Sequence, residues 1–323
     1  MTISRHLNLR VKSALIIWAL LAAVSANLQA GKAFQILETM QKELVIQMEG
    51  KAVGRYMFEH DASSKETYHE TYKPFLHVID PETGITLTKG PGGQFTHHRG
   101  IFLGWNRLTT SEGSFDLWHM NKGIQVHQAF TSKKLTPHDA SFTSNIHWLV
   151  HDEKIVMTEL RKMTFSHDGR KNTIAVVDLT TRLTSKVDLE LKGDPEHAGV
   201  QYRPANEVNK KATAYLFPEE KQNPRKDFDL PWVNQYYELN DKGYSVTHMN
   251  HPDNPRPTRY SAYRDYGRFG AFFTTSLEEG ESLILHYRFV IRRGKPGTRE
   301  SIQNEFLHWI KDRQGKSNRF KTN

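Results

Sequence analysis

The sequence of 323 residues contains no cysteine. It can therefore form no disulfide bond, and catalysis by a thiol nucleophile is excluded. An exported protein of this composition must be held together by its hydrophobic core alone. The sequence also lacks any apolar run of 18 residues after its first thirty positions, so we expect no membrane span in the mature chain.

Several catalytic signatures are missing as well. The chain has no phosphate-binding P-loop, no G-x-G-x-x-G after a strand and no G-x-S-x-G nucleophile elbow. Neither H-E-x-x-H nor H-x-x-E-H occurs, so a zinc protease of the known helical type is not indicated. Any chemistry must come from residues that are dispersed along the chain.

Positive charge is less concentrated than the net value of +8 suggests. The first thirty residues contribute +3, and the segment from Arg299 onwards contributes another +3. The body between them carries only +2, without the clustering that a nucleic-acid-binding face requires. We therefore expect no nucleic-acid partner and a solvated, basic C-terminal tail.

Residues 1–30 have the pattern of a secretory signal peptide. Arg5, Arg10 and Lys12 precede an apolar run over 14–24 that is too short for a comfortable membrane span, and small residues suited to cleavage follow. The pattern predicts a secreted or periplasmic protein. An uncleaved N-terminal anchor stays open as the alternative.

Short apolar segments with period-two alternation recur at regular spacing, as in antiparallel sheets. Turn residues separate them, and Asp168-Gly169 between two such segments is a strong hairpin signal. The pattern predicts an all-β fold, a large antiparallel β-sandwich (galactose-mutarotase-like or jelly-roll-like) with a short C-terminal helix. We expect a single sandwich domain over 31–298 and a helical basic tail over 299–323. The apolar stripe of that helix is formed by Ile302, Phe306, Trp309 and Ile310.

Six segments carry polar and aromatic residues that a β-sandwich does not require. The most informative, 90–105, begins with a glycine-rich loop, places two imidazoles and a guanidinium side by side, and continues into an apolar strand. Histidine titrates near neutral pH, and aromatic faces pack against the C–H side of sugar rings. The segments are His97-His98-Arg99-Gly100, Trp118-His119, 194–203, 251–256, 264–270 and His286-Tyr287-Arg288.

These motifs, in this order and spacing, resemble a bacterial family catalogued as "methane oxygenase PmoA". The patterns HHRG, WH, EHxG, HPxNPR, RDYGxFG and LxYRFVIRRG occur over 72–296, about 70% of the chain. The resemblance implies an exported β-sandwich protein, of a kind often encoded near sugar oxidoreductases, sulfatases and polysaccharide-degrading enzymes. One departure is Ala198, where the resemblance leads us to expect a second glycine. The catalogue name does not fit, because a membrane methane monooxygenase subunit needs several apolar spans.

We expect a carbohydrate-active enzyme that uses acid–base chemistry on a sugar or oligosaccharide, as a lyase, epimerase or hydrolase. His98 or His119 is the expected general base, with Glu196 and His197 on the acid side, because burial can raise the pKa of a glutamate. Arg264 is the remaining catalytic candidate, because a guanidinium can stabilise a developing oxyanion.

Substrate contacts are expected mainly from aromatic and basic side chains. Arg99 is expected to hold a carboxylate, while Trp118 and Tyr266 are expected to form stacking walls. The candidate binding residues are His97, Arg99, Trp118, Tyr202, His251, Asn254, Arg256 and Tyr266.

Two alternatives from other classes stay open. A non-catalytic carbohydrate-binding module would show aromatic side chains on an open face and dispersed histidines. A mononuclear metal enzyme would take three nitrogen ligands from among His97 or His98, His119, His197 and His251, with Glu196 as the base. Beyond such a single divalent metal ion, no cofactor is expected. The arrangement of the six segments discriminates between these readings, because catalysis requires them to meet in one concavity.

Overall fold

The computed structural model describes residues 33–40, 42–151 and 153–320. The predicted signal peptide lies outside these residues. Among the described helices, none has the length and apolar character that a membrane crossing requires.

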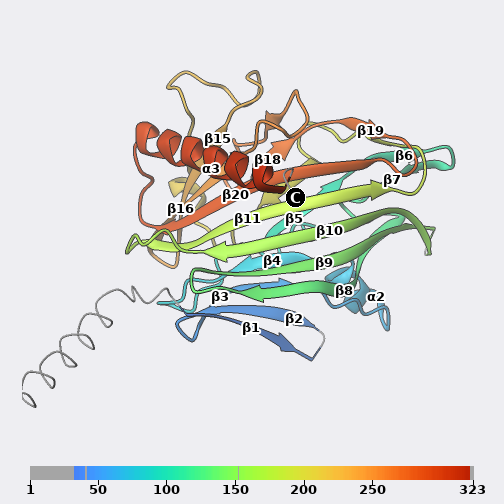
Figure 1. The fold of residues 1–323 in the computed structure, drawn as a ribbon, viewed down its shortest axis with the longest axis horizontal. Coiled ribbons are helices and arrows are strands. Elements are labelled where there is room, and N and C mark those ends of the chain that lie inside the picture. The colour runs from blue at the N-terminus through green and yellow to red at the C-terminus, as the bar shows by residue number, and fades with distance from the viewer. Residues whose placement is uncertain (1–32, 41, 152, 321–323) are drawn as a thin grey trace, which may run out of the picture.

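The prediction of an all-β, antiparallel fold is confirmed, because the described strands form sheets of eight, eight and four (Figure 1). In spatial order, the first sheet comprises β1 (Phe34–Thr39), β2 (Glu43–Met48), β3 (Lys51–Met57), β4 (Phe75–Val78), β5 (Ile101–Trp105), β13 (Ala198–Tyr202), β18 (Phe269–Phe272) and β17 (Arg259–Tyr260). The second comprises β14 (Ala214–Leu216), β15 (Trp232–Leu239), β16 (Lys242–Asn250), β20 (Ser282–Arg293), β11 (Thr173–Ser185), β10 (Lys154–Ser166), β9 (Asp139–Val150) and β8 (Gly123–Leu135). The small sheet comprises β19 (Thr275–Leu277), β12 (Leu189–Leu191), β6 (Leu108–Thr110) and β7 (Gly113–Phe115).

The main hydrophobic core lies between the two large sheets. Strands β9 and β10 alternate buried and more exposed residues almost throughout, as expected of strands with one face on a core. Aromatic rings meet across the layers: Tyr56 of β3 lies 4.9 Å from Phe142 of β9, and Trp105 of β5 lies 6.0 Å from Trp148 of β9. The β-sandwich architecture therefore follows from period-two patterning.

The predicted hairpin at Asp168-Gly169 is confirmed. Strands β10 and β11 pair antiparallel on either side of it, and Gly169 adopts φ +81°, which favours glycine. The polar segment after β5 contains the short strands β6 and β7. These pair with β12 and with each other, contacts that local alternation does not predict.

Strands β5 and β13 are buried along their whole length, so both faces of the first sheet are covered here. One face lies on the core, and the segment that follows β7 covers the other. The Leu117 amide donates a hydrogen bond to the Trp105 carbonyl at 2.9 Å. At Gly104, an added Cβ would lie 2.4 Å from the Leu117 carbonyl oxygen, so this close approach requires glycine.

The C-terminal helix α3 (Arg299–Phe320) begins at the predicted residue and lies across the outer face of the second sheet (Figure 1). Ile302, Phe306 and Trp309 of the predicted stripe are buried against Val176, Trp232, Met249 and Val290. The expectation that only this end is helical is wrong, since α2 (Lys65–Thr71) and the 3₁₀ turn η1 (Lys210–Ala212) also form. Helix α2 is stabilised by a capping box at Ser64, a local signal that apolar periodicity does not reveal.

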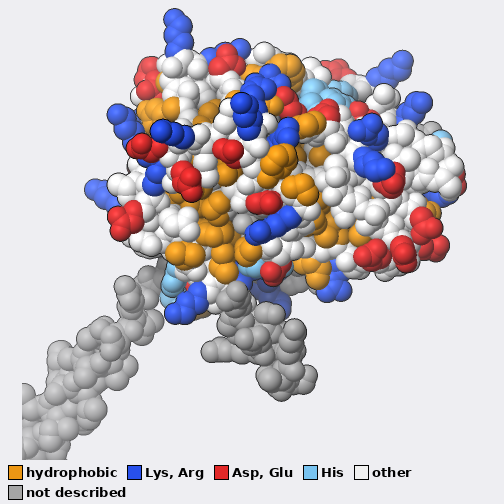
Figure 2. Space-filling view, turned by 90° about the horizontal axis from the view of Figure 1, so that it is seen from above, with side chains coloured by type: hydrophobic (Ala, Val, Ile, Leu, Met, Phe, Trp, Pro, Cys, Tyr) orange, Lys and Arg blue, Asp and Glu red, His pale blue; other side chains and the backbone are white. Residues whose placement is uncertain are grey.

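Charged side chains of both signs are interspersed over the face that Figure 2 shows. No extended field of positive charge covers that face.

Candidate functional site

His97 lies at the end of a glycine-rich loop that two buried cations hold in place. The Lys89 ammonium donates hydrogen bonds to three carbonyl oxygens of the loop, at 2.5–3.2 Å. The Arg99 guanidinium donates to the Thr96 carbonyl, to the His98 carbonyl that Lys89 also binds, and to the carbonyl of His69 in α2. Phe95 adopts φ +55°, a left-handed conformation that is rare for an aromatic residue. The loop thus presents His97 in a fixed position.

His119 lies in the segment between β7 and β8. The buried Lys73 donates a hydrogen bond of 2.5 Å to the Trp118 carbonyl and so anchors the backbone beside it. The Asp116 carboxylate accepts the His119 amide hydrogen and the His119 Nδ1 hydrogen, each at 2.8 Å. Burial raises the pKa of Asp116, but the bonds from His119 outweigh it and the pKa is lowered. Asp116 is therefore an anion that holds the His119 ring.

His197 directly precedes β13 and is held in a similar way. Its Nδ1 lies 2.8 and 2.9 Å from the two oxygens of Asp194. The same carboxylate accepts hydrogen bonds from the Asn106 side chain at 2.6 Å and from the Glu196 amide at 2.8 Å. Burial opposes ionisation, yet the bond from His197 and the others lower the pKa of Asp194 to about 2. Because an ionised carboxylate only accepts hydrogen bonds, the proton of His197 lies on Nδ1.

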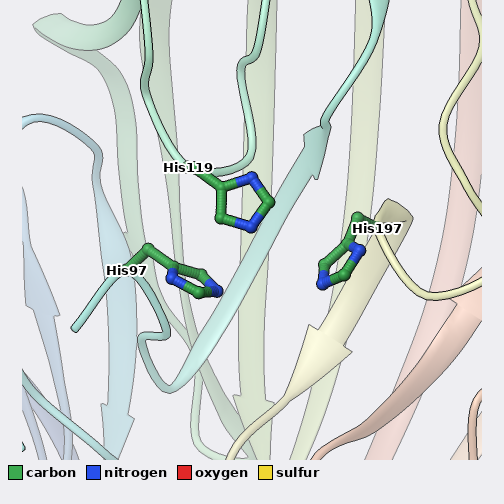
Figure 3. Close-up of side chains that lie close together, drawn as sticks. All are labelled: His97, His119 and His197. Carbon is green, nitrogen blue, oxygen red and sulfur yellow. The ribbon is translucent and has the colours of Figure 1, made fainter. Parts of the chain in front are cut away.

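These three segments bring the imidazoles of His97, His119 and His197 together (Figure 3). The ring centroid of His119 lies 4.2 Å from that of His97 and 5.1 Å from that of His197. One nitrogen from each ring lies within 4.8 Å of the other two. Figure 3 shows the rings turned toward a shared space. We call these three residues the histidine triad.

The His97 ring is held neutral. Burial is the main cause, and the nearby charges of His119 and Lys73 add to it, so that the pKa of His97 is lowered to about 2. Its Nε2 atom is buried and has no hydrogen-bond partner within the described residues. A neutral imidazole with an unengaged ring nitrogen is the form that binds a metal ion.

The triad fits a single divalent transition-metal ion. With Nδ1 of His119 and His197 bound to carboxylates, Nε2 is the free nitrogen of each ring, as in sites where a carboxylate orients a histidine ligand. Two nitrogens that each lie about 2.1 Å from a tetrahedral zinc ion are roughly 3.4 Å apart. The ring nitrogens of the triad lie within 4.8 Å of one another, so each pair would have to approach by roughly 1.4 Å at most to bind the ion. Three histidine ligands also leave a coordination position open, as catalytic zinc sites do.

Glu196, which was expected on the acid side, is instead an ion-paired carboxylate. It accepts hydrogen bonds from the Tyr263 hydroxyl and from the guanidinium groups of Arg264 and Arg268, the last at 2.8 Å. Burial raises its pKa, but the bonds from Arg264 and Tyr263 and the charge of Arg268 outweigh burial, and the pKa of Glu196 is lowered. The expected upward shift is therefore wrong. Arg264 is likewise engaged by Glu196.

A cavity of about 440 Å³ adjoins the triad and shares His197 with it. This volume lies within the range of small-molecule sites. The Arg225 guanidinium lies 3.6 Å from the centroid of the Tyr263 ring at this cavity. The lining residues are Asp194, Pro195, Glu196, His197, Arg225, Arg259 and Tyr263.

His98 and Tyr266 lie behind the triad. His98 is 2% exposed, its ring centroid is 4.3 Å from that of His97, and burial followed by the charge of His97 lowers its pKa far below the ordinary value. A ring so enclosed does not reach the cavity, so its expected role as general base is not supported. Tyr266 is also buried, with its ring 4.9 Å from that of Phe95.

Three more predicted residues are structural. Trp118 is fully buried beneath the site, with its ring 4.8 Å from Phe102, so it forms no open stacking wall. Arg99 donates its hydrogen bonds to backbone carbonyls, so it positions the loop that carries His97 and not a substrate. Tyr202 lies in the core between the sheets, where its hydroxyl is 2.7 Å from that of Tyr237. Direct substrate contact by these residues is therefore contradicted.

The segment 251–256 does not join the triad. His251 is buried, with its ring 5.3 Å from Trp309 of α3. Asn254 donates hydrogen bonds to Asn250 and to the His286 carbonyl, and so fixes this turn against β20. The expectation that His251 and Asn254 line the site is wrong, because they support the docking of the C-terminal helix. Arg256 is exposed at the end of the same turn.

Sequence reasoning missed the two carboxylates that orient the triad. Asp116 precedes His119 by three residues, and Asp194 precedes His197 by three. The repeated Asp-x-x-His spacing was a readable signal, since a turn of that length lets the carboxylate reach the ring of its own segment. Tyr263 and Arg268 donate hydrogen bonds to Glu196 through tertiary contacts, and no comparable spacing in the sequence indicates them.

Known structures with a similar course of the chain were found at low identity. A heparan sulfate lyase mutant from Pedobacter heparinus is 8% identical with a TM-score of 0.43, covering 83% of this chain and 36% of its own. An aldose epimerase homologue from C. elegans is 7% identical with a TM-score of 0.36, covering 82% of this chain and 100% of its own. A protein from Escherichia coli K12, whose proposed activity is that of an aldose 1-epimerase, is 10% identical with a TM-score of 0.32. The match covers 82% of this chain and 100% of that protein.

This chain spans about a third of the length of the lyase and of a kojibiose phosphorylase that also matches. These similarities concern only the path of the backbone, and the activities of these proteins are not assigned to this chain. No curated protein matches the sequence. The family model described as "Family of unknown function (DUF6807)" matches residues 43–306. The resemblance of the motifs to the PmoA-named family stays a prediction.

Proposed function

The chain belongs to DUF6807, a family of unknown function, and on that premise we propose that it is a mononuclear metal enzyme acting on a carbohydrate. The proposed ligands are His97, His119 and His197. The observation that carries the proposal is their convergence from three distant segments, with two rings oriented by carboxylates and the third left with a buried, unpartnered nitrogen. A solvated or purely structural set of histidines has no need of this arrangement.

An open coordination position favours catalysis over a structural metal site. When bound, the ion would supply Lewis-acid polarisation of a substrate oxygen, the chemistry of catalytic zinc. The chain's own residues would orient the ligands and bind the substrate. Asp116 and Asp194 keep the proton of each partner histidine on Nδ1, so that the opposite nitrogen faces the shared space.

Glu196 serves this site as an organiser of hydrogen-bond donors. Its carboxylate holds Tyr263 and Arg264 beside His197, so a phenol hydroxyl and a guanidinium are presented near the triad. Tyr263 also lines the adjoining cavity. Polar groups fixed in this way suit the hydroxyls of a sugar, with the Tyr263 oxygen as an acceptor and the remaining N–H groups of Arg264 as donors, and the cavity volume suits a small molecule. We retain carbohydrate as the substrate class and export as the location, both as proposals.

The test is metal analysis of protein expressed without a histidine tag. We expect about one equivalent of a divalent transition metal per chain, measured by mass spectrometry after exhaustive dialysis. After removal of the ion, addition of Co²⁺ should produce the visible absorption band of Co²⁺ bound by a few nitrogen ligands. His119→Ala and His197→Ala should each abolish tight binding, because two ligands hold an ion poorly.

His138→Ala is the matched control, since His138 is exposed and lies outside the triad. It should retain the metal content and the Co²⁺ spectrum of the wild type. Background metal content in the wild-type protein would contradict the proposal. So would equal loss of metal in the control and the triad variants.

A further inference from the structure

Two guanidinium groups at the cavity beside His197 lack a carboxylate partner within the described residues. Arg225 lies over the Tyr263 ring at 3.6 Å, and Arg259 lies over the Phe228 ring at 4.6 Å. Both line the same cavity. Both guanidinium groups stack on an aromatic ring, and because Arg225 is exposed and Arg259 partly exposed, their N–H donors remain available to a ligand in the cavity.

The carboxylates close to this cavity are already engaged. Asp194 is bound by His197 and Asn106, and Glu196 by Tyr263 and two other arginines. Neither forms an ion pair with Arg225 or Arg259. With Arg264 and Arg268 included, four guanidinium groups stand against these two carboxylates, and a metal ion on the triad would add further positive charge.

Two acidic residues of the neighbouring loops, Asp227 and Asp229, form no ion pair with Arg225 or Arg259 within the described residues. Asp227 accepts the Asn223 amide hydrogen at 2.6 Å, and Asp229 accepts the Thr258 amide hydrogen at 2.8 Å. Asp227 thus closes a turn of its own loop, and Asp229 links its loop to the segment that contains Thr258. A guanidinium has a planar fork of donors that matches a carboxylate or a sulfate, and it binds such groups in a bidentate manner.

The aromatic rings complete the chemistry of the cavity. Tyr263 presents a half-buried ring in the cavity, and Phe228, which is 46% exposed, lies next to the cavity beside Arg259, so apolar surface lies beside the charged groups. A pyranose that carries an acidic group offers a C–H face to an aromatic ring and an anion to a guanidinium. A neutral sugar would use the rings but would leave both cations unpaired.

We propose that the substrate of this site is an anionic sugar whose carboxylate or sulfate is bound by Arg225 and Arg259 next to the metal ion. This inference rests on the proposed function, since it places the sugar against the triad. It narrows the substrate class from carbohydrates in general to acidic ones.

Binding to the zinc-loaded full chain by titration calorimetry tests the inference. The probes are D-glucuronate and D-galacturonate for the carboxylate, D-glucose 6-sulfate for the sulfate, and D-glucose and D-galactose as neutral counterparts. We expect at least one anionic probe to bind tenfold or more tightly than its neutral counterpart. The arm that responds identifies the acidic group.

The Arg225→Gln/Arg259→Gln double variant should lose this preference while its binding of neutral sugars and its zinc content stay unchanged. Arg182→Gln, an exposed arginine on β11, is the matched control and should behave as the wild type. Equal affinity for anionic and neutral sugars in the wild type, no binding of any probe, or an undiminished preference in the double variant would overturn the inference. Failure of the wild type to hold zinc would instead overturn the proposed function, and the zinc content is measured separately.

Discussion

Replacing Asp194 by asparagine tests how the triad is oriented. The substitution keeps the shape of the side chain but removes its charge and one acceptor oxygen. Asp194 accepts hydrogen bonds from His197 Nδ1, from the Asn106 amide group and from the Glu196 backbone. An asparagine cannot accept at both positions, so its NH₂ group must face one of these donors. We expect the His197 ring to lose its fixed orientation.

The size of the effect follows from the burial of the carboxylate. Loss of a carboxylate that orients a metal ligand lowers metal affinity about 10- to 100-fold, which corresponds to about 1.4–2.7 kcal/mol. The Asp194 side chain is 44% exposed, so water can replace part of what is lost, and we expect about tenfold. Asp116 is 24% exposed, so Asp116→Asn should have the larger effect, toward 100-fold.

The assay is competition for Zn²⁺ against a chromophoric chelator at pH 7, with urea unfolding of the metal-free proteins in parallel. Asp253→Asn is the matched control, because Asp253 also lies beside a histidine, 3.5 Å from His251 Nδ1, but outside the triad. Zinc affinities of Asp194→Asn and Asp116→Asn within twofold of the wild type would refute the reasoning. A comparable loss in Asp253→Asn would show that the effect is not specific to the triad.

Three further predictions concern packing and pH. Gly104→Ala should weaken zinc binding roughly tenfold in the chelator assay. The new Cβ would lie 2.4 Å from the Leu117 carbonyl oxygen and would displace the loop that carries the ligand His119. Trp309→Ala should lower the free energy of unfolding by about 3–5 kcal/mol in urea titration, while Leu307→Ala, at an exposed position of the same helix, should change it little. The folded-state pKa of Asp194, about 2, lies below its ordinary 3.8, so its stabilisation is present above pH 3.8 and is lost as the pH falls toward 2. The metal-free wild type should therefore lose stability more steeply than Asp194→Asn over that window in pH-dependent unfolding, and parallel curves would contradict this.

The sequence by itself determined the fold class and much of the local structure. Period-two alternation identifies strands such as β9 and β10, because one face of each must be buried. The Asp168-Gly169 turn and the apolar stripe of α3 could be located for the same kind of reason, since each depends on neighbours within one segment. The sequence also contains the Asp-x-x-His spacing of Asp116 with His119 and of Asp194 with His197, which is a local signal for carboxylates that orient histidine rings.

Only the tertiary structure decided which histidines share a site. In the sequence, His251 is as good a candidate as His197, yet it packs against the C-terminal helix. His197 joins the triad because β13 pairs with β5, a strand about a hundred positions earlier. The loops of His97 and His119 then cover these same strands. Strand order depends on which faces pack best over the whole chain, so no local pattern encodes it.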